Sequence, residues 1–167
     1  MPKIVDRDEY KKDLAKRAAG IFSEYGYAGI GMRGIAEHLG VSKSALYHYF
    51  PTKEALFLAC TESVMIGVSQ TNLNPAATEE DQLLALVNSM RRGFGAEMGL
   101  VLEYLRGKNP EEIASDEAMQ VSISTYLKTV EDIVGTERAV EALEIVMGKL
   151  MLEHLSGGSL GISSFRF

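Results

Sequence analysis

The sequence predicts an all-α fold in which a helix-turn-helix head precedes a helical body. Apolar residues recur along the chain at the three- and four-residue spacing of amphipathic helices, and capping residues flank several of these stretches. With 167 residues, of which 46% are apolar, the chain is long enough to bury a core. We therefore expect one helical domain of ordinary size or two small ones.

Charge is distributed unevenly along the chain. Residues 1–53 hold nine Lys and Arg against six Asp and Glu, a balance of +3, whereas the remaining residues hold eight against seventeen, a balance of −9. A basic head on an acidic body suggests separate tasks for the two parts. This asymmetry favours polyanion binding at the N-terminal end.

No feature of a membrane or secreted protein is evident. No run approaches the roughly 20 apolar residues that a membrane span requires, and the charged start MPKIVDRDEYKKD is unlike a signal peptide. We therefore expect a cytoplasmic protein. The one cysteine, Cys60, has no Cys or His at metal-ligand spacing, so we expect a buried thiol, no metal and no cofactor.

The first helix is predicted within residues 6–26. Asp6, with Glu9 three residues later, resembles a capping box, and Gly26 suits the left-handed position that ends a helix. One face is apolar, through Leu14, Ala18, Ile21, Phe22 and Tyr25. The segment GIGMRG at 29–34 has the glycine spacing of a dinucleotide-binding loop, which requires a preceding strand. Because a helix precedes it here, we interpret GIGMRG as a connection between helices.

Residues 35–50, IAEHLGVSKSALYHYF, have the pattern of a helix-turn-helix. Ala36 lets two helices cross closely, Gly40 takes the turn conformation, and Leu46 fills the angle between the helices. Ser42 is the expected N-cap of the second helix. Four outward residues of that helix are able to bond to phosphates or base edges: Lys43, Ser44, Tyr47 and His48.

Residues 10–57 resemble the DNA-binding domain of the tetracycline-repressor (TetR) family of bacterial transcription regulators. The motifs that carry the resemblance are F-x-x-x-G-Y at 22–27, I-A at 35–36, G-V-S at 40–42, L-Y-x-x-F at 46–50 and K-E-x-L at 53–56. The resemblance implies an all-α homodimer with a DNA-binding head for a palindromic operator and a helical ligand-binding and dimerisation body. It also implies that the chain is a ligand-responsive regulator, which we expect to be a repressor.

On this basis we divide the chain into a DNA-binding head at 1–53, an effector-binding and dimerisation body at 54–156, and a Gly-rich tail at 157–167 that includes Phe165 and Phe167. One departure from the family lies at Gly31 and Met32, where Ser or Thr is common. Such residues cap the helix and often contact phosphate, whereas Gly caps weakly and Met bonds poorly to phosphate. That phosphate contact is therefore open in this chain.

Six residues are expected to contact double-stranded DNA. Lys43 and Ser44 begin the recognition helix and should reach base edges, and Lys53 should contact phosphate at the positive end of the next helix. The full set is Arg33, Lys43, Ser44, Tyr47, His48 and Lys53. The alternative for Arg33 and His48 is a solvated surface position, and for Tyr47 a ring packed on the first helix.

The body is expected to supply the contact between two copies. A long helix follows residue 53, shorter stretches are interrupted near Gly93, and two apolar stripes at 119–134 and 140–151 are joined at Gly135. We expect these last two helices to be antiparallel and to form a four-helix interface; a core hairpin within one copy is the alternative. The expected interface residues are Ile123, Val130, Val140, Leu143, Met147 and Leu150.

An effector pocket is implied by the family. Eight Met residues, most of them after residue 60, together with several aromatic residues suit an adaptable apolar cavity, although Met at helical spacing also suits plain core. The expected lining is Phe57, Met90, Phe94, Met98, Tyr104, Met119 and Tyr126. Since the pattern forces no charged residue inward, an uncharged or amphipathic effector is favoured.

Two other functions were weighed. An enzyme is not expected, because His38, His48 and His154 have no nucleophile or acidic cluster at recognisable spacing. The remaining alternative is a helical dimer whose head binds another protein in place of DNA.

Overall fold

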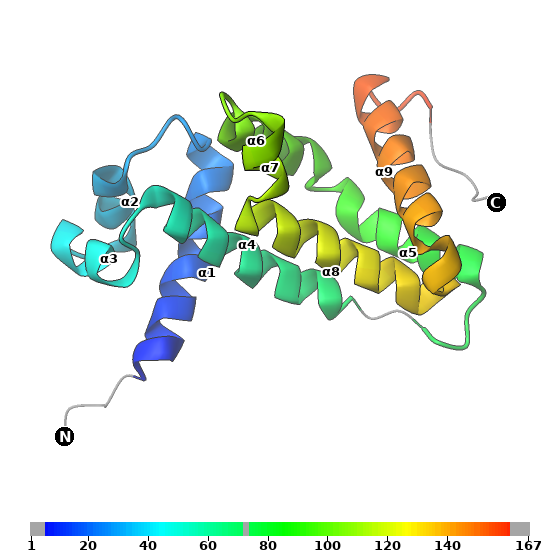
Figure 1. Cartoon of the computed structure of the whole chain (residues 1–167), viewed down its shortest axis with the longest axis horizontal. Helices are drawn as coiled ribbons and strands as arrows, with labels where there is room; N and C mark the ends of the chain where they lie inside the picture. The colour runs from blue at the N-terminus through cyan, green and yellow to red at the C-terminus, as the bar shows by residue number, and fades with distance from the viewer. Residues whose placement is uncertain (1–5, 72–73, 161–167) are drawn as a thin grey trace. The chain divides into compact units, whose positions relative to one another are not determined.

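The computed structural model describes residues 6–71 and 74–160, and every regular element within those ranges is a helix (Figure 1). The all-α prediction is confirmed. By packing, the helices fall into two compact units: unit 1 consists of Met1–Ile66 and Gly99–Ser122, and unit 2 of Gly67–Met98 and Ile123–Phe167. Phe165 and Phe167 of the expected Gly-rich tail lie outside the described residues. In the described ranges, no helix has the length and apolar character to span a bilayer.

Unit 1 contains the head. Its helices are α1 (Arg7–Tyr25), α2 (Met32–Leu39), α3 (Lys43–Tyr49), most of α4 (Lys53–Ser69), the second half of α6 (Phe94–Leu105), α7 (Pro110–Ala114) and the start of α8 (Glu117–Val134). Residues 99–122 thus pack with the head although they follow it by some 40 residues. The functional division at residues 53 and 156 stays a prediction, because packing groups the chain differently.

Helix α1 lies where its sequence predicts, although the described contacts do not include the Glu9 bond of a capping box and Gly26, with ψ of 163°, is not in the left-handed helical conformation. The Asp6 side chain accepts a hydrogen bond from the backbone N–H of Asp8 (3.0 Å) and caps the helix. Gly26, with φ of 75°, ends it, and its N–H bonds to the carbonyl of Phe22. Leu14, Ala18 and Phe22 are buried, whereas Tyr25 of the expected stripe is 41% exposed.

The helix-turn-helix is built by local signals. Gly40 has a φ of 71°, a left-handed conformation that residues with a Cβ adopt at a cost, and it turns the chain out of α2. Ser42 then caps α3 by accepting from the N–H of Ala45 at 3.1 Å. Leu46 is completely buried between the helices. The predicted motif is confirmed.

An aromatic cluster forms the centre of unit 1. The rings of Phe57 and Tyr104 are stacked with centroids 4.1 Å apart, and Tyr27 meets Tyr104 edge-on at 5.0 Å. Phe22 lies against both Tyr27 and Phe57. The side chain of Glu103 accepts a hydrogen bond from the N–H of Ala28 at 3.2 Å, which ties α6 to the turn after α1.

Cys60 is buried between α4 and α1, as predicted. Its thiol donates a hydrogen bond to the carbonyl of Ala15 at 3.2 Å. Burial raises the pKa of the Cys60 thiol to about 12. The thiol is therefore neutral at physiological pH.

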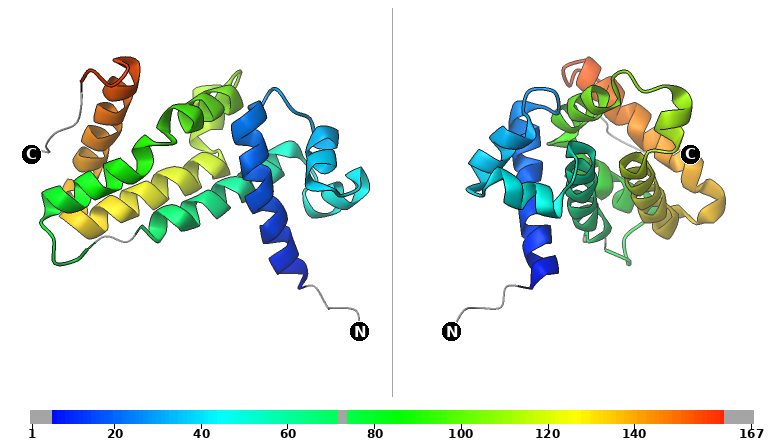
Figure 2. Two further views of the ribbon diagram at one scale, coloured as in Figure 1. Left: turned by 180° about the vertical axis from the view of Figure 1, so that it is seen from behind. Right: turned by 60° about the vertical axis from the view of Figure 1, so that its left-hand side comes forward.

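Unit 2 is held by a core of its own. It contains α5 (Glu79–Arg91), the start of α6, most of α8, a 3-10 turn at Thr136–Arg138 and α9 (Ala139–Leu155). Its most buried side chains are Leu83, Leu86, Val87, Val130, Val146 and Leu150. Gly135, with φ of 82°, ends α8, so the predicted joint is confirmed. Helix α9 packs on α5 and leaves α8 at an open angle, so the two helices do not lie side by side along their lengths (Figures 1 and 2).

Candidate nucleic-acid interface and effector groove

Helix α3 presents the polar face that the sequence predicts. Lys43, Ser44, Tyr47 and His48 are all exposed, Tyr47 by 38%, while Leu46 points into the core. The ammonium of Lys43 lies 5.6 Å from the centroid of the Tyr47 ring. Four of the six expected DNA-contact residues therefore share one helix and one solvent-facing side, and their side chains offer donors suited to phosphates and base edges.

Arg33 stands apart on α2. It forms an ion pair with Glu37 one turn later, with 3.0 Å between Nε and Oε1, and the two side chains are 83% and 65% exposed. Pairs as exposed as this contribute little free energy and exchange partners readily. Arg33 therefore remains available to a phosphate.

The ammonium of Lys53 is held by contacts within the head, unlike the exposed side chains of α3. Its ammonium donates a hydrogen bond to the carbonyl of Tyr27 and lies 4.3 Å from the centroid of that ring. Partial burial lowers the pKa of Lys53. An ammonium has three donors, so two remain after the bond to Tyr27. Thr52 caps α4 by accepting from the N–H of Ala55 at 3.0 Å.

His48 has a partner that sequence reasoning missed. The guanidinium of Arg7 lies 2.9 Å from Nε2 of His48. Since a guanidinium only donates, Nε2 accepts and the neutral ring carries its proton on Nδ1. The signal was present in the sequence: Arg7 and Lys11 extend, towards the N-terminus, the stripe that continues through Leu14 and Ala18.

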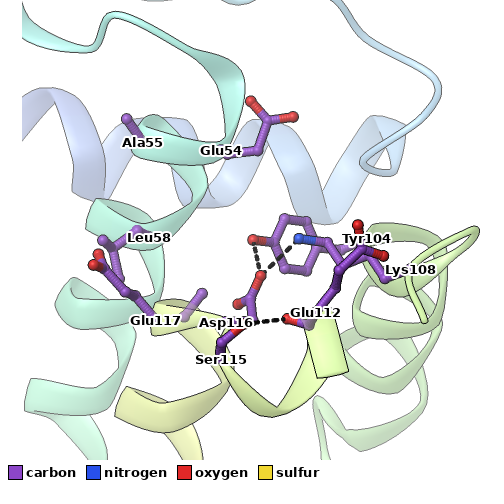
Figure 3. Close-up of a pocket in the computed structure, with 10 residues that line it drawn as sticks. Glu54, Ala55, Leu58, Tyr104, Lys108, Glu112, Ser115, Asp116 and Glu117 are labelled. Carbon is purple, nitrogen blue, oxygen red and sulfur yellow. Dashed lines mark hydrogen bonds and ion pairs between the residues drawn. The ribbon is translucent and has the colours of Figure 1, made fainter. Parts of the chain in front are cut away.

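A groove of about 500 Å³ opens on unit 1 between α4 and the segment from α6 to α8 (Figure 3). Leu58 and Tyr104 contribute apolar surface, and four carboxylates and one ammonium line the rest. The lining is Glu54, Ala55, Leu58, Tyr104, Lys108, Glu112, Ser115, Asp116, Glu117 and Ala118. The groove is thus more acidic than the apolar cavity expected from the sequence.

Asp116 accepts hydrogen bonds from groups on three segments around this groove. Its Oδ2 accepts hydrogen bonds from the Tyr104 hydroxyl and the Lys108 ammonium, both at 2.7 Å, and its Oδ1 accepts from the N–H of Met119 at 3.1 Å. Burial raises the pKa of Asp116, but these three hydrogen bonds outweigh it and hold the pKa below the usual value. Asp116 is therefore ionised, and it neutralises the one cation of the groove.

The seven residues expected to line a pocket are divided between the two units. Tyr104 lines the groove, while Phe57 and Met119 are buried in the core of unit 1. Met90 and Phe94 are buried in the core of unit 2, and Met98 and Tyr126 pack against that core. In the described residues, five of the seven, Tyr104 included, are buried core side chains, which is the alternative that Met-rich helices left open.

The expected interface residues are also divided, between core and surface. Val130 and Leu150 are at most 2% exposed and belong to the core of unit 2, with Leu143 and Met147 half-buried against it. Ile123 and Val140 are 60% and 58% exposed. Of the six expected interface residues, Ile123 and Val140 are therefore the two that are exposed for contact with a second copy.

Comparison with known proteins places this geometry in a family. Residues 14–60 match the family model described as bacterial regulatory proteins, tetR family. The head is a TetR-family domain. The regulator RutR of Escherichia coli strain K12 is 34% identical over 98 residues, which are 59% of this chain and 39% of RutR. The transcriptional activator FasR of Mycolicibacterium smegmatis is 34% identical over 87 residues, 50% of this chain and 39% of FasR.

The fold likeness extends beyond the TetR head. The structure of the regulator FadR from Bacillus subtilis, solved with stearoyl-CoA, superposes with a TM-score of 0.64 at 18% identity and covers 90% of this chain and 89% of FadR. At that identity the likeness concerns the fold alone. The matched parts of RutR and FasR amount to 39% of each, so the chain spans about two fifths of those relatives. RutR is a transcriptional regulator and FasR a transcriptional activator by name.

Proposed function

We propose that the chain is a DNA-binding transcription regulator that acts as a symmetric dimer on a palindromic operator, represses, and responds to a small molecule. The observation that carries the proposal is α3, which exposes Lys43, Ser44, Tyr47 and His48 on one side of a rigidly packed helix-turn-helix. Such a helix enters the major groove with its N-terminal residues against base edges. In a two-fold dimer the half-sites lie roughly 34 Å apart.

A first experiment measures affinity for a random-sequence duplex as a function of salt. Each lost phosphate contact flattens the slope of log K against log salt by about 0.9, so Lys53→Ala should flatten it by about 1.8 per dimer. Glu37→Gln is a control, because it removes the Arg33 ion pair and leaves every cation in place. A parent protein with no affinity at low salt would favour the protein-binding alternative.

Sequence readout requires a second experiment. Selection of bound fragments from the source genome should yield a two-fold motif for the parent, and Ser44→Ala should change base preference within each half-site if Ser44 faces bases. An identical motif for both proteins would remove Ser44 from the readout. A reporter fused to the selected promoter distinguishes repression from activation.

The groove suggests the class of effector. Lys108 is already neutralised by Asp116, which leaves the charges of Glu54, Glu112 and Glu117 uncompensated within the lining. A hydrogen bond from its own backbone N–H lowers the pKa of Glu54, and the Tyr27 hydroxyl adds a second at 3.1 Å, so this carboxylate stays ionised. Apolar surface beside uncompensated carboxylates suits an amphipathic ligand with a positive charge.

Glu54 also gives such a ligand a route to the DNA interface. A cation that binds Glu54 competes with the Tyr27 hydroxyl, and the carbonyl of the same tyrosine holds the Lys53 ammonium. DNA release follows to the extent that the ligand prefers one arrangement of these groups. Hydrophobic amines should release DNA and chain-matched carboxylic acids should not; Glu54→Gln with Glu117→Gln should weaken the amine response. Equal release by both series would contradict the cationic class.

A further inference from the structure

Two cations on the first turns of α1 lie beside the recognition helix. The guanidinium of Arg7 hydrogen-bonds to His48 at 2.9 Å and lies 6.0 Å from the centroid of the Tyr49 ring. The ammonium of Lys11 lies 5.6 Å from the centroid of the Phe50 ring. Arg7 and Lys11 are four residues apart, so they occupy the same side of α1. Their positive charge therefore adjoins the C-terminal end of α3.

In the part of the chain that the structure describes, neither charge forms an ion pair with a carboxylate. Among the described ion pairs, Arg17 and Arg33 have carboxylate partners, whereas Arg7 and Lys11 have none and are exposed. The acidic residues of the first turn do not change this. Asp6 accepts the capping hydrogen bond, and Asp8 and Glu9 lie about 100° and about 200° around the helix from Arg7. Asp8 is three residues before Lys11, which is neighbouring spacing on a helix, but the described ion pairs do not include one between these two residues.

The hydrogen bond to His48 leaves most N–H donors of the Arg7 guanidinium available. A guanidinium has five N–H donors, and the described contact with Nε2 occupies one. The remaining edge suits a phosphate, which a guanidinium binds through two parallel hydrogen bonds. In this position Arg7 is anchored to the helix that faces DNA and still carries its full charge.

We propose that Arg7 and Lys11 bind the DNA backbone beside the groove that α3 enters, so that each head contacts phosphates with α1 as well as with α3 and α4. The inference rests on the proposed DNA-binding function and extends it to a helix outside the helix-turn-helix. Such contacts position the head on DNA and carry no base preference of their own.

The test uses the whole chain and a random-sequence duplex over a series of salt concentrations. Arg7→Ala and Lys11→Ala should each flatten the salt slope by about 1.8 per dimer, from about 0.9 per phosphate contact, and Arg7→Lys should retain the parent slope. Lys16→Ala is the matched control: it removes the same charge from the same helix, about 180° from Arg7. Its slope should be that of the parent, apart from long-range effects shared by all three variants.

Three outcomes overturn the inference. In the first, Lys53→Ala flattens the slope while Arg7→Ala and Lys11→Ala give the slope of Lys16→Ala. The head then binds DNA, but α1 does not contact phosphates. If Arg7→Ala has no effect in a His48→Ala background, Arg7 acts only by orienting His48, which a double-mutant cycle detects. A parent that binds no duplex at low salt overturns the proposed function itself, and the role of α1 with it.

Discussion

Asp116 joins three parts of unit 1 through a single carboxylate. Tyr104 on α6, Lys108 in the following loop and the first turn of α8 all donate to it. The side chain of Asp116 is 6% exposed and that of Lys108 26%, so the pair lies largely out of water. Removal of one partner from such a pair costs more than the pair contributes, because the other charge is left buried and unpaired.

We predict that Asp116→Asn lowers the free energy of unfolding by about 3 kcal/mol at pH 7. The pKa of Asp116 is lowered by folding, so its stabilising effect is complete above the usual value of 3.8 and is lost as pH falls through the folded-state pKa. Urea titrations should therefore show a gap between parent and variant at pH 7 that narrows below pH 3.8.

Asp132→Asn provides the comparison for this experiment. Asp132 pairs with Lys128 on the surface of α8, where the two side chains are 62% and 64% exposed. That substitution should cost less than about 1 kcal/mol. An Asp116→Asn variant as stable as Asp132→Asn at pH 7 would show that Asp116 does not hold α6 and α8 together.

Among the helices, α2 begins at an N-cap residue, Gly31, that makes no side-chain hydrogen bond to the first turn. Gly31 has an extended backbone, φ −96° and ψ 167°, and no side chain to accept from the first turn. A Cβ at this position meets no atom within 4 Å. A serine therefore fits without displacing its neighbours, and its oxygen can accept from an N–H of the first turn.

We predict that Gly31→Ser stabilises the chain by a few tenths of a kcal/mol. Its hydroxyl also restores a donor for phosphate, so affinity for duplex DNA should rise. Thermal unfolding and duplex titration measure the two effects separately. Gly31→Ala controls for the loss of chain flexibility; if it raised DNA affinity as much as Gly31→Ser, the hydroxyl would have no part in the gain.

The sequence was sufficient for elements whose signals are local. Asp6, Gly26, Gly40 and Ser42 act within a few residues of themselves, and each begins or ends a helix where predicted. Helix α7 was overlooked although Asn109 precedes Pro110 and Glu112, the pattern of a complete capping box.

Periodicity was insufficient for residues whose partners are distant in sequence. It identifies an apolar side of a helix but not what covers that side, so Val130 and Ile123 were grouped together although one is 0% and the other 60% exposed. The Arg7 contact with His48 spans 41 residues. The groove depends on Asp116, whose partners come from three segments that only folding brings together.

At the scale of the whole molecule, the exposed apolar residues of unit 2 bear on assembly. Ile123 on α8 and Val140 on α9 are more than half exposed, and Leu152 and Leu155 follow on α9 at 57% and 73%. These exposed aliphatic side chains are the apolar surface that unit 2 offers to a second copy. This agrees with the proposed dimer.

We predict that Ile123→Glu with Val140→Glu yields a monomer at micromolar concentration, whereas the parent sediments as a dimer. Both sites are exposed within one chain, so the charges should leave folding intact and oppose burial between copies. Leu102→Glu in unit 1 is the control, because Leu102 is 63% exposed. A double variant that is still a dimer would show that the interface lies elsewhere. A parent that is a monomer would contradict the prediction of a two-fold operator.

The buried thiol between α1 and α4 can report how often the core of unit 1 opens. Cys60 is the one cysteine in the sequence, it is 4% exposed, and a pKa near 12 leaves almost no thiolate to react. A thiol reagent can modify Cys60 only when the two helices separate. The labelling rate therefore measures how frequently the core of the head opens. The same single-site chemistry can then report, without an added probe, whether DNA or an effector makes those openings rarer or more frequent.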